Sequence, residues 1–507
     1  MTLHQKSDSL WSPRTVALAM LCALLVAAPY FWPFLWGPVP EMWPNLFAWA
    51  VGSALIFLLP LLRARVDIAV VSGWLIAALG SAVLGTLQYF DLENALYPWV
   101  VPTLAGFSTA NLHQFNMLAT MLAVGLFCVW WLASKNYIKA LNAAWMAGLL
   151  LVALAATASR TGLIHLMAIS CMLLYWHPRQ WKRLLVIIAA GWALYGVAAK
   201  SLPWLVWVTR GIVVNRDLVS RFGEEVGCHS RRQIWSNVLD LIAVKPWTGW
   251  GFGELLYAHY ISDFGADRFC DKLSNAHNLP LHMAFSMGVP VTLALLALCV
   301  LAIVKLRPWA ATDALERMCW GVLALLGLHS MLEYPLWYGV FQLMGGLAIW
   351  LIYKIRTPIR RIAPAHTTRF SAGRAAITGL LLSGLAFVAW DYVKVSQLYT
   401  PQHLRLEGFR TETLSKSQTT WLFQPYVLIA QITTLELRPE NAALMLEAAL
   451  SALHTAPDSQ VIRKVIESAA LVGRADLVAL HLARYKAAWP IEYEEWLEQQ
   501  KIAAGVR

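Results

Sequence analysis

One histidine, His277, stands where a polar segment of about 65 residues gives way to an apolar stretch. A histidine can take up a proton at neutral pH, so this side chain is a candidate general base. Pro280 suits the first turn of a helix, which predicts that a helix begins beside His277 and Asn278. The alternative is that His277 only caps that helix or hydrogen-bonds a neighbouring group.

An arginine pair lies earlier in the same polar segment. Ser230 and Gln233 have the spacing of a capping box, and an apolar face follows them, which predicts an amphipathic helix from Ser230. Arg231 and Arg232 would then stand in its first turn, where a helix already favours anions. Two cations there work against the helix unless an anion compensates them, which favours a phosphate site. The alternative is an interfacial helix that contacts lipid headgroups.

Three further polar segments interrupt apolar sequence. Arg160 breaks one apolar stretch, and an arginine near the bilayer faces a cavity or an anion unless it snorkels to the headgroups. His329 and Glu333 lie between two late stretches, where the carboxylate could orient a histidine, pair with an arginine or hydrate the turn. Gln114 and Asn116 add uncharged hydrogen-bonding groups before another stretch.

The segment 248–254 is rich in glycine, which invites comparison with nucleotide-binding loops. No strand–turn–helix pattern surrounds it, so we reject that interpretation. We expect it to let the backbone turn tightly instead.

The composition excludes an ordinary soluble protein. Hydrophobic residues make up 59% of the chain and charged residues 14%, mean hydropathy is +0.55, and there are 26 Trp. A membrane span takes about 20 apolar residues. The sequence predicts eleven spans, at about 15–35, 45–62, 66–87, 114–134, 139–158, 163–176, 184–206, 278–304, 318–332, 336–353 and 375–392.

Basic residues of the short loops fall on one side of such a membrane, and we take that side as cytoplasmic. The net charge of +11 therefore reflects topology, and it does not predict nucleic-acid binding. The first apolar run has no small-residue cleavage site, so we expect a retained anchor.

We therefore expect an all-α, polytopic membrane protein. Residues 1–206 would hold seven spans, 207–277 a large outer loop, 278–392 four more spans, and 393–507 an outer helical tail. Helix pairs of the tail's length resemble tetratricopeptide-type repeats, and a small helical bundle fits the pattern equally well.

Two of the seven cysteines, Cys228 and Cys270, lie in the predicted outer loop, where a disulfide is possible. Such a bond would hold the arginine segment near His277. No metal-ligand spacing appears, and the four-residue spacing of Asp263, Asp267 and Asp271 suggests a solvated helix face, so we expect neither metal nor cofactor.

These motifs together resemble a known family. Residues 231–235, 245–246, 249–253 and 276–278 resemble the Wzy_C region shared by O-antigen ligases, O-antigen polymerases and bacterial protein O-oligosaccharyltransferases. Residues 329–338 and the helical tail look like the PglL-type oligosaccharyltransferase branch. Residues 114–116 resemble that branch's glutamine–asparagine motif, which departs from the pattern at Met117, where a histidine is expected.

The resemblance implies metal-independent, inverting glycosyl transfer on the periplasmic side of the inner membrane. The donor would be a glycan on undecaprenyl diphosphate, and the acceptor a Ser or Thr of a protein such as a pilin. His277 would be the activating base, Arg231 a diphosphate ligand and Tyr334 an essential late tyrosine. The further substrate-binding candidates are Arg160, Arg221, Arg232, Asn278, Gln114, His329 and Glu333.

Three other functions remain open. An O-antigen ligase would use the same donor with a lipid A core sugar as acceptor, and an O-antigen polymerase would extend the glycan. A transporter of lipid-linked glycan would do no chemistry. The chain has no visible internal repeat and its polar groups gather at one membrane face, which disfavours the transporter.

Overall fold

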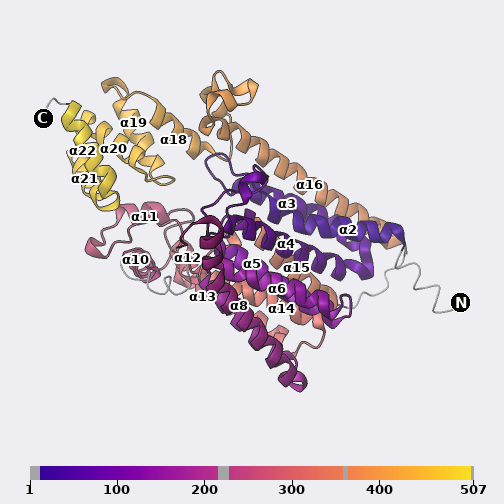
Figure 1. The fold of residues 1–507 in the computed structure, drawn as a ribbon. Coiled ribbons are helices and arrows are strands. Elements are labelled where there is room, and N and C mark those ends of the chain that lie inside the picture. Colours follow the sequence, from indigo (N-terminus) through magenta and orange to yellow (C-terminus); the bar gives the residue numbers. More distant parts are fainter. Residues whose placement is uncertain (1–11, 215–227, 358–363, 504–507) are drawn as a thin grey trace. The chain divides into compact units, whose positions relative to one another are not determined.

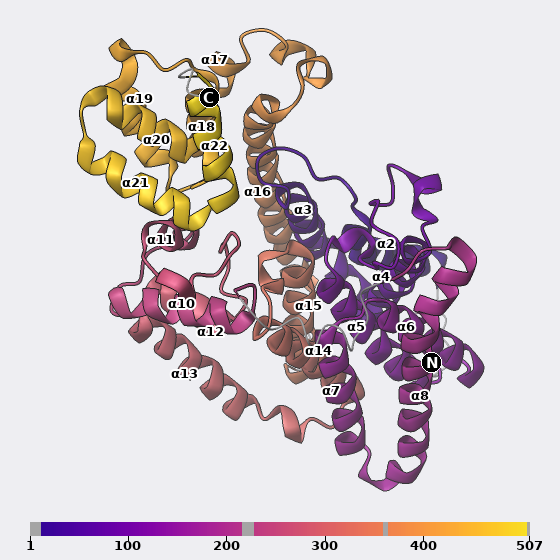
Figure 2. The same ribbon diagram turned by 60° about the vertical axis from the view of Figure 1, so that its left-hand side comes forward.

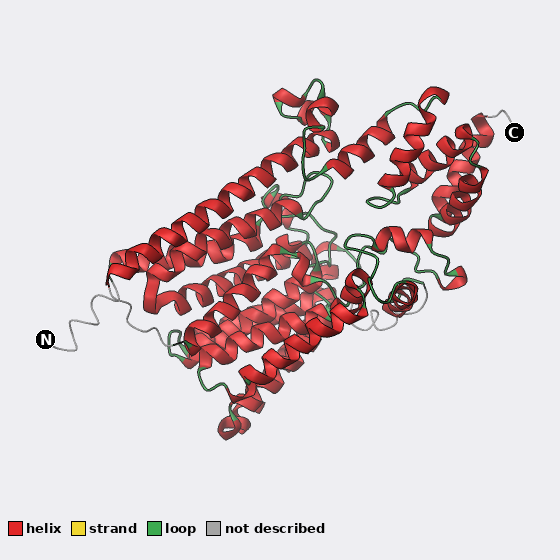
Figure 3. Cartoon of the chain, turned by 180° about the vertical axis from the view of Figure 1, so that it is seen from behind, coloured by secondary structure: helices red, strands yellow, loops and turns green. Residues whose placement is uncertain are grey.

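The computed structural model describes residues 12–214, 228–357 and 364–503, and this part of the chain is all-helical with no strand (Figures 1 and 3). The predicted all-α class is confirmed. Arg221 lies outside the described residues.

A helix lies at each of the eleven predicted apolar stretches. That all eleven cross the membrane stays a prediction. These helices are α2 (Pro13–Ala27), α3 (Met42–Leu58), α4 (Val66–Tyr89), α5 (Phe115–Ser134), α6 (Ala140–Ala156), α7 (Arg160–Trp176), α8 (Trp181–Arg210), α13 (Val289–Leu306), α14 (Ala314–Ser330), α15 (Gly339–Arg356) and α16 (Pro364–Ser396). Within the described ranges, seven helices are long and apolar enough to cross a membrane: α2, α3, α4, α5, α8, α13 and α16. The chain is a membrane protein.

The predicted span at 278–304 is wrong at its start. Its first residues form a separate short helix, α12 (Leu279–Met287), and α13 begins only at Val289. The break falls at Gly288, whose φ of +82° is left-handed and whose missing side chain lets its backbone pass against the Trp247 carbonyl.

The described helices divide into two compact units. The first holds α2 to α8, α14, α15 and most of α16, and the second holds the outer loop, most of α13 and the tail. The loop and the tail, which the sequence separates by four apolar stretches, therefore belong to one unit.

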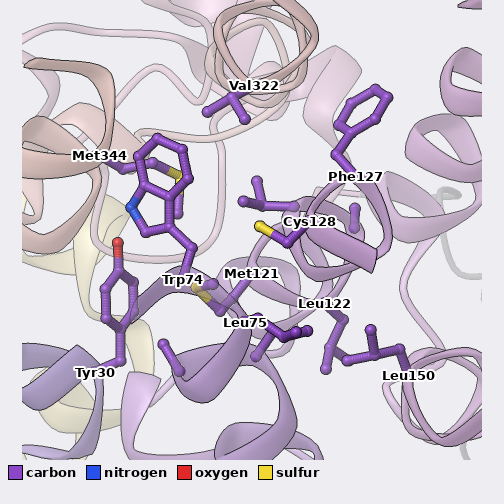
Figure 4. Close-up of a cluster of buried hydrophobic side chains, with 14 of the residues drawn as sticks. Tyr30, Trp74, Leu75, Met121, Leu122, Phe127, Cys128, Leu150, Val322 and Met344 are labelled. Carbon is purple, nitrogen blue, oxygen red and sulfur yellow. The ribbon is translucent and has the colours of Figure 1, made fainter. Parts of the chain in front are cut away.

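In the first unit, α4 and α5 carry the core. Trp74 of α4 and Phe127 of α5 are fully buried among apolar side chains (Figure 4). Glycines allow close approach of neighbouring helices: a Cβ on Gly73 of α4 would lie 2.6 Å from Val26 of α2, and one on Gly125 of α5 would lie 2.5 Å from Ala78 of α4. Small residues at helix contacts are the usual means of close packing within a bilayer.

In the second unit, three loop helices share one apolar core, and one of them also packs on the tail helices. The loop contributes α10 (Arg231–Val244), α11 (Leu255–Ile261) and α12, and the tail contributes α17 (Thr413–Ser417), α18 (Gln424–Thr434), α19 (Ala442–Ala452), α20 (Ser459–Val472), α21 (Ala475–Ala488) and α22 (Pro490–Ala503). Helix α11 lies beside α21 (Figure 2). Tyr260 of α11 is buried in the tail's apolar core, and its hydroxyl hydrogen-bonds with His481 Nδ1 at 2.8 Å. Asp263 pairs with Arg484 at 2.9 Å. These contacts require the loop and the tail to lie on the same side of the membrane.

The glycine-rich segment makes the tight turn that the sequence predicts. The N–H groups of Trp250 and Gly251 donate to the carbonyls of Phe285 and Ser286, at 2.8 and 3.1 Å. Gly249 has a φ of +69°, and a Cβ there would lie 2.6 Å from the Phe285 carbonyl oxygen. The glycine is thus needed for backbone-to-backbone contact with the end of α12.

This contact predicts that substitution by alanine costs more stability at Gly249 than at Gly253. Gly253 is also left-handed, with φ +82°, but a Cβ there meets nothing within 4 Å. Gly253→Ala should lose about 1–2 kcal/mol of stability from the backbone alone, whereas Gly249→Ala should lose about 1–3 kcal/mol more from the clash. Thermal unfolding of the detergent-purified variants measures the gap, and equal melting temperatures would contradict the packing described.

Candidate functional site

His277 occupies a turn that two asparagines hold. Its φ of +50° is left-handed, which is uncommon for a residue with a side chain. The His277 N–H donates to Asn275 Oδ1 at 2.9 Å, and Asn278 caps α12 by accepting the Leu281 N–H at 3.1 Å. The predicted helix start beside His277 is confirmed. The strained conformation, which costs about 1–2 kcal/mol, is thereby fixed on both sides of the histidine.

The residue before His277 is anchored through its own peptide groups. The Trp235 indole N–H donates to the Ala276 carbonyl at 3.1 Å. The Ala276 N–H donates to His282 Nδ1 at 3.4 Å, and burial lowers the pKa of His282 to about 4, which keeps this imidazole neutral and able to accept. Ala276 is completely buried. The backbone leading into His277 is therefore tied directly to α10.

The same helix carries the arginine pair. Ser230 caps α10 by accepting the Gln233 N–H at 3.2 Å, as predicted. Arg231 is half-buried and lies four residues before Trp235, so the two share a helix face, while Arg232 is exposed. Arg231 thus stands one turn from the tryptophan that contacts the His277 turn.

The second half of the predicted capping box is wrong. The Gln233 side chain does not return to the cap; it donates to the Asp267 carbonyl, and Asn237 donates to the same oxygen at 2.8 Å. Asn237 also accepts the Phe269 N–H at 2.8 Å. The Asp267 carbonyl and the Phe269 N–H, which lie about 30 residues further along the chain, are thus the partners of these two side chains.

A disulfide joins Cys228 and Cys270 across 42 residues of sequence. The Cys270 N–H also donates to the Cys228 carbonyl at 3.3 Å. His229 lies close enough to both sulfurs that the three residues could share a metal ion, but bonded sulfurs are not thiolate ligands. The bond therefore supports α10 at its first turn.

A second polar site lies in the first unit, at the ends of α5, α7 and α14. Glu333 is only 4% exposed, and its carboxylate accepts from Asn116 at 2.9 Å and from Gln114 at 3.3 Å. The Ser159 hydroxyl, at the cap of α7, donates to Asn116 Oδ1 at 2.6 Å. Asn116 therefore links Glu333 to the helix that Arg160 begins.

A buried hydroxyl extends this network into the helix bundle. Thr120 lies 3.0 Å from His165 Nε2 and 2.8 Å from His329 Nδ1, and all three side chains are fully buried. The N–H of Glu333 donates to the His329 carbonyl at 2.8 Å. The position of Glu333 thus depends on the end of α14, which Thr120 and His165 fix in turn.

Tyr334 follows Glu333 and stacks on Tyr338 with ring centroids 6.1 Å apart. Burial, and then the neighbouring Glu333 carboxylate, raise the pKa of Tyr334. The phenol therefore stays protonated at neutral pH and can donate a hydrogen bond.

The residues that the sequence predicts fall into two sets, one in each unit. The first unit brings Gln114, His329, Glu333 and Tyr334 together, with Arg160 half-buried at the start of the adjoining helix α7. The second holds Arg231, Arg232, His277 and Asn278 beside the disulfide.

Sequence reasoning missed Thr120 and His165 in the first unit, and Trp235, Asn275 and His282 as supports of His277. A histidine inside an apolar helix is itself a functional signal, so His165 could have been found. The others are recognisable only from long-range contacts.

Two models of known protein families match parts of this chain. The family model described as O-Antigen ligase, Wzy_C, matches residues 145–296, which include Arg231 and His277. Over these residues the chain is similar to the O-antigen ligase family. A second family model, described as "Virulence factor membrane-bound polymerase, C-terminal", matches residues 317–503.

Two curated proteins of Acinetobacter baylyi are similar to this chain. The chain is 27% identical over 332 residues to a general O-oligosaccharyltransferase, covering 63% of this chain and 56% of the relative. It is 26% identical over 245 residues to a ComP-specific O-oligosaccharyltransferase, covering 48% and 43%. The chain thus matches about half the length of these relatives. No solved structure matches it.

The Asn116–Glu333 hydrogen bond predicts that the isosteric substitution Asn116→Asp lowers the stability of the protein. Asn116→Asp would place a second buried carboxylate oxygen against Glu333 and should cost about 2–3 kcal/mol of stability. Asn136→Asp, the same change at an exposed turn residue, is the matched control. Thermal unfolding in detergent should separate the two variants by several degrees, and coincident transitions would argue against this network.

The disulfide predicts selective protection of two thiols. In denatured, non-reduced protein, alkylation should label Cys22, Cys128, Cys171, Cys299 and Cys319 and spare Cys228 and Cys270 until a reductant is added. Peptide mass spectrometry reads out each position. Modification of Cys228 and Cys270 before reduction would show that the bond is absent.

Proposed function

We propose that this protein transfers a glycan from a lipid-linked oligosaccharide to a Ser or Thr hydroxyl of a protein. The proposed donor carries its glycan on undecaprenyl diphosphate, and the proposed location is the periplasmic face of the bacterial inner membrane. The observation that supports this most is the anchoring of the His277 turn to α10, which carries Arg231 one turn away. Both residues fall within the stretch that the O-antigen ligase family model matches.

In this proposal His277 is the general base. A serine or threonine hydroxyl is a poor nucleophile, and a positioned base typically contributes about 10²–10⁴-fold. His277 takes the hydroxyl proton as the oxygen bonds to the anomeric carbon from the face opposite the diphosphate. The bond from that carbon to the diphosphate oxygen breaks, and the diphosphate leaves with the electron pair, which inverts the anomeric centre.

Arg231 stabilises the leaving diphosphate. A guanidinium offers paired N–H donors in a fork that suits phosphate oxygens, and the first turn of α10 adds free N–H groups and the positive end of a helix dipole. Arg232 is exposed next to it and can contribute long-range attraction. We propose that these cations neutralise the diphosphate without a metal.

We propose that the polar residues of the first unit also take part in this reaction, because the family resemblance assigns them that role. By the predicted topology, the starts of α5 and α7 and the end of α14 face the outer side, as the loop does. Tyr334, kept protonated by burial and by Glu333, is proposed to donate a hydrogen bond to the donor or the leaving group. Arg160 and Gln114 are proposed to bind the glycan or the diphosphate, with Glu333 and His329 as supports.

An O-antigen ligase is the second candidate, because the matched family model carries that description. The two functions differ only in the acceptor. In a deletion strain, protein O-glycan transfer predicts a faster-migrating glycoprotein such as a pilin and an unchanged lipopolysaccharide ladder. Loss of O-antigen with an unchanged protein acceptor would favour the ligase instead.

Substitution of the base should separate catalysis from binding. With purified enzyme, undecaprenyl-diphosphate-linked glycan and an acceptor protein, His277→Ala should lower the transfer rate by about 10²–10⁴-fold and leave donor affinity near that of wild type. Arg231→Ala should weaken both, because its charge acts on the bound diphosphate. The measurements are single-turnover transfer and donor binding.

His403→Ala, at an exposed tail histidine, is the control and should transfer at the wild-type rate. Full transfer by His277→Ala would remove the base from the mechanism. Wild-type donor affinity in Arg231→Ala would remove the diphosphate role from Arg231.

A further inference from the structure

An apolar groove lies within the first unit, between α3, α15 and the early part of α16. Its volume is about 660 Å³, and most of its walls come from residues 48–60 and 342–350. Figure 1 shows α16 running along α3, where the Thr378 hydroxyl donates to the Ser53 carbonyl at 3.1 Å. None of its lining residues belongs to either polar site described above.

The groove is open because glycines line it. Gly52 and Gly346 face it from α3 and α15, and a Cβ on Gly346 would meet nothing within 4 Å. Residues 48–60 rise about 18 Å along a helix, which exceeds half of a hydrocarbon core about 30 Å thick. The lining therefore extends along the helix over a length that suits an alkyl chain.

Three polar side chains of the groove wall, Trp49, Ser53 and Gln342, are hydrogen-bonded within the protein, whereas one donor of Arg374 is unpaired within the part of the chain that the structure describes. The Trp49 indole N–H donates to Gln342 Oε1 at 2.7 Å and closes one end, and the Ser53 hydroxyl donates to the Trp49 carbonyl at 2.8 Å. At the other end stands Arg374, whose Nε is buried and has no hydrogen-bond partner among the described residues. Arg374 as a whole is half-buried, but a buried N–H donor without an acceptor is costly, and an anion would relieve that cost.

We propose that this groove binds an anionic phospholipid, with the headgroup phosphate on Arg374 and an acyl chain between α3 and α15. The apolar wall excludes a soluble anion as the complete ligand, because it would leave the groove unfilled. The predicted orientation places Arg374 toward the cytoplasmic leaflet, where anionic headgroups meet basic pockets between helices. The donor's diphosphate is proposed to lie at the opposite side, which separates this ligand from the substrate.

Two variants test the two halves of the site. Arg374→Gln should lower retention of phosphatidylglycerol about tenfold and leave phosphatidylcholine with the same acyl chains unchanged. Gly346→Leu should fill the groove and lower retention of both lipids, and it should fold, because leucine favours a helix over glycine. Native mass spectrometry of the full-length protein, titrated with each lipid, measures the bound fraction.

The matched controls are Arg179→Gln, an exposed arginine on the same predicted side, and Gly327→Leu, a helical glycine with open space elsewhere. Both should retain the lipids as wild type does. The proposal would be overturned if wild type retained the two lipids equally, or if Arg374→Gln retained as much phosphatidylglycerol as wild type does. Preferential retention of a polyprenyl phosphate would assign the groove to a polyprenyl lipid and also overturn it.

Discussion

The hydrogen bond from the Trp235 indole to the Ala276 carbonyl is the constraint on which the candidate site depends. It joins two segments 41 residues apart and sets the distance between a basic helix start and a histidine turn. Ser230 and the Cys228–Cys270 disulfide fix the first turn of α10. Such preorganisation is what general-base catalysis and stabilisation of a leaving anion both require.

The first unit holds a hydrogen-bonded network of polar side chains between apolar helices. Polar groups among membrane helices must find partners within the protein, and Asn116 and Thr120 provide them by bridging three helices. One backbone device recurs: His113, Ala158 and His277 are all left-handed, and each directly precedes the residue that opens a helix. The chain therefore turns sharply into α5, α7 and α12, which start at the polar sites.

Composition and local pattern were enough to predict the helices, the Ser230 cap and the helix start beside His277, since these depend on neighbours in sequence. The prediction failed where long-range partners compete. Gln233 leaves the cap for the Asp267 carbonyl, and Gly288 ends α12 because its backbone packs against Trp247. The Thr120–His165–His329 contacts and the Trp235–Ala276 bond join residues that no sequence spacing relates.

The most direct measurement is the transfer rate of Trp235→Phe, which keeps an aromatic ring on α10 and removes only the N–H donor. With lipid-linked glycan and an acceptor that wild type glycosylates, the rate at saturating donor should fall at least about tenfold, because His277 would no longer be held at its position. Donor affinity and thermal stability should stay close to wild type, as they should in Trp421→Phe, an 82% exposed control. A Trp235→Phe enzyme with the full wild-type transfer rate would contradict the account.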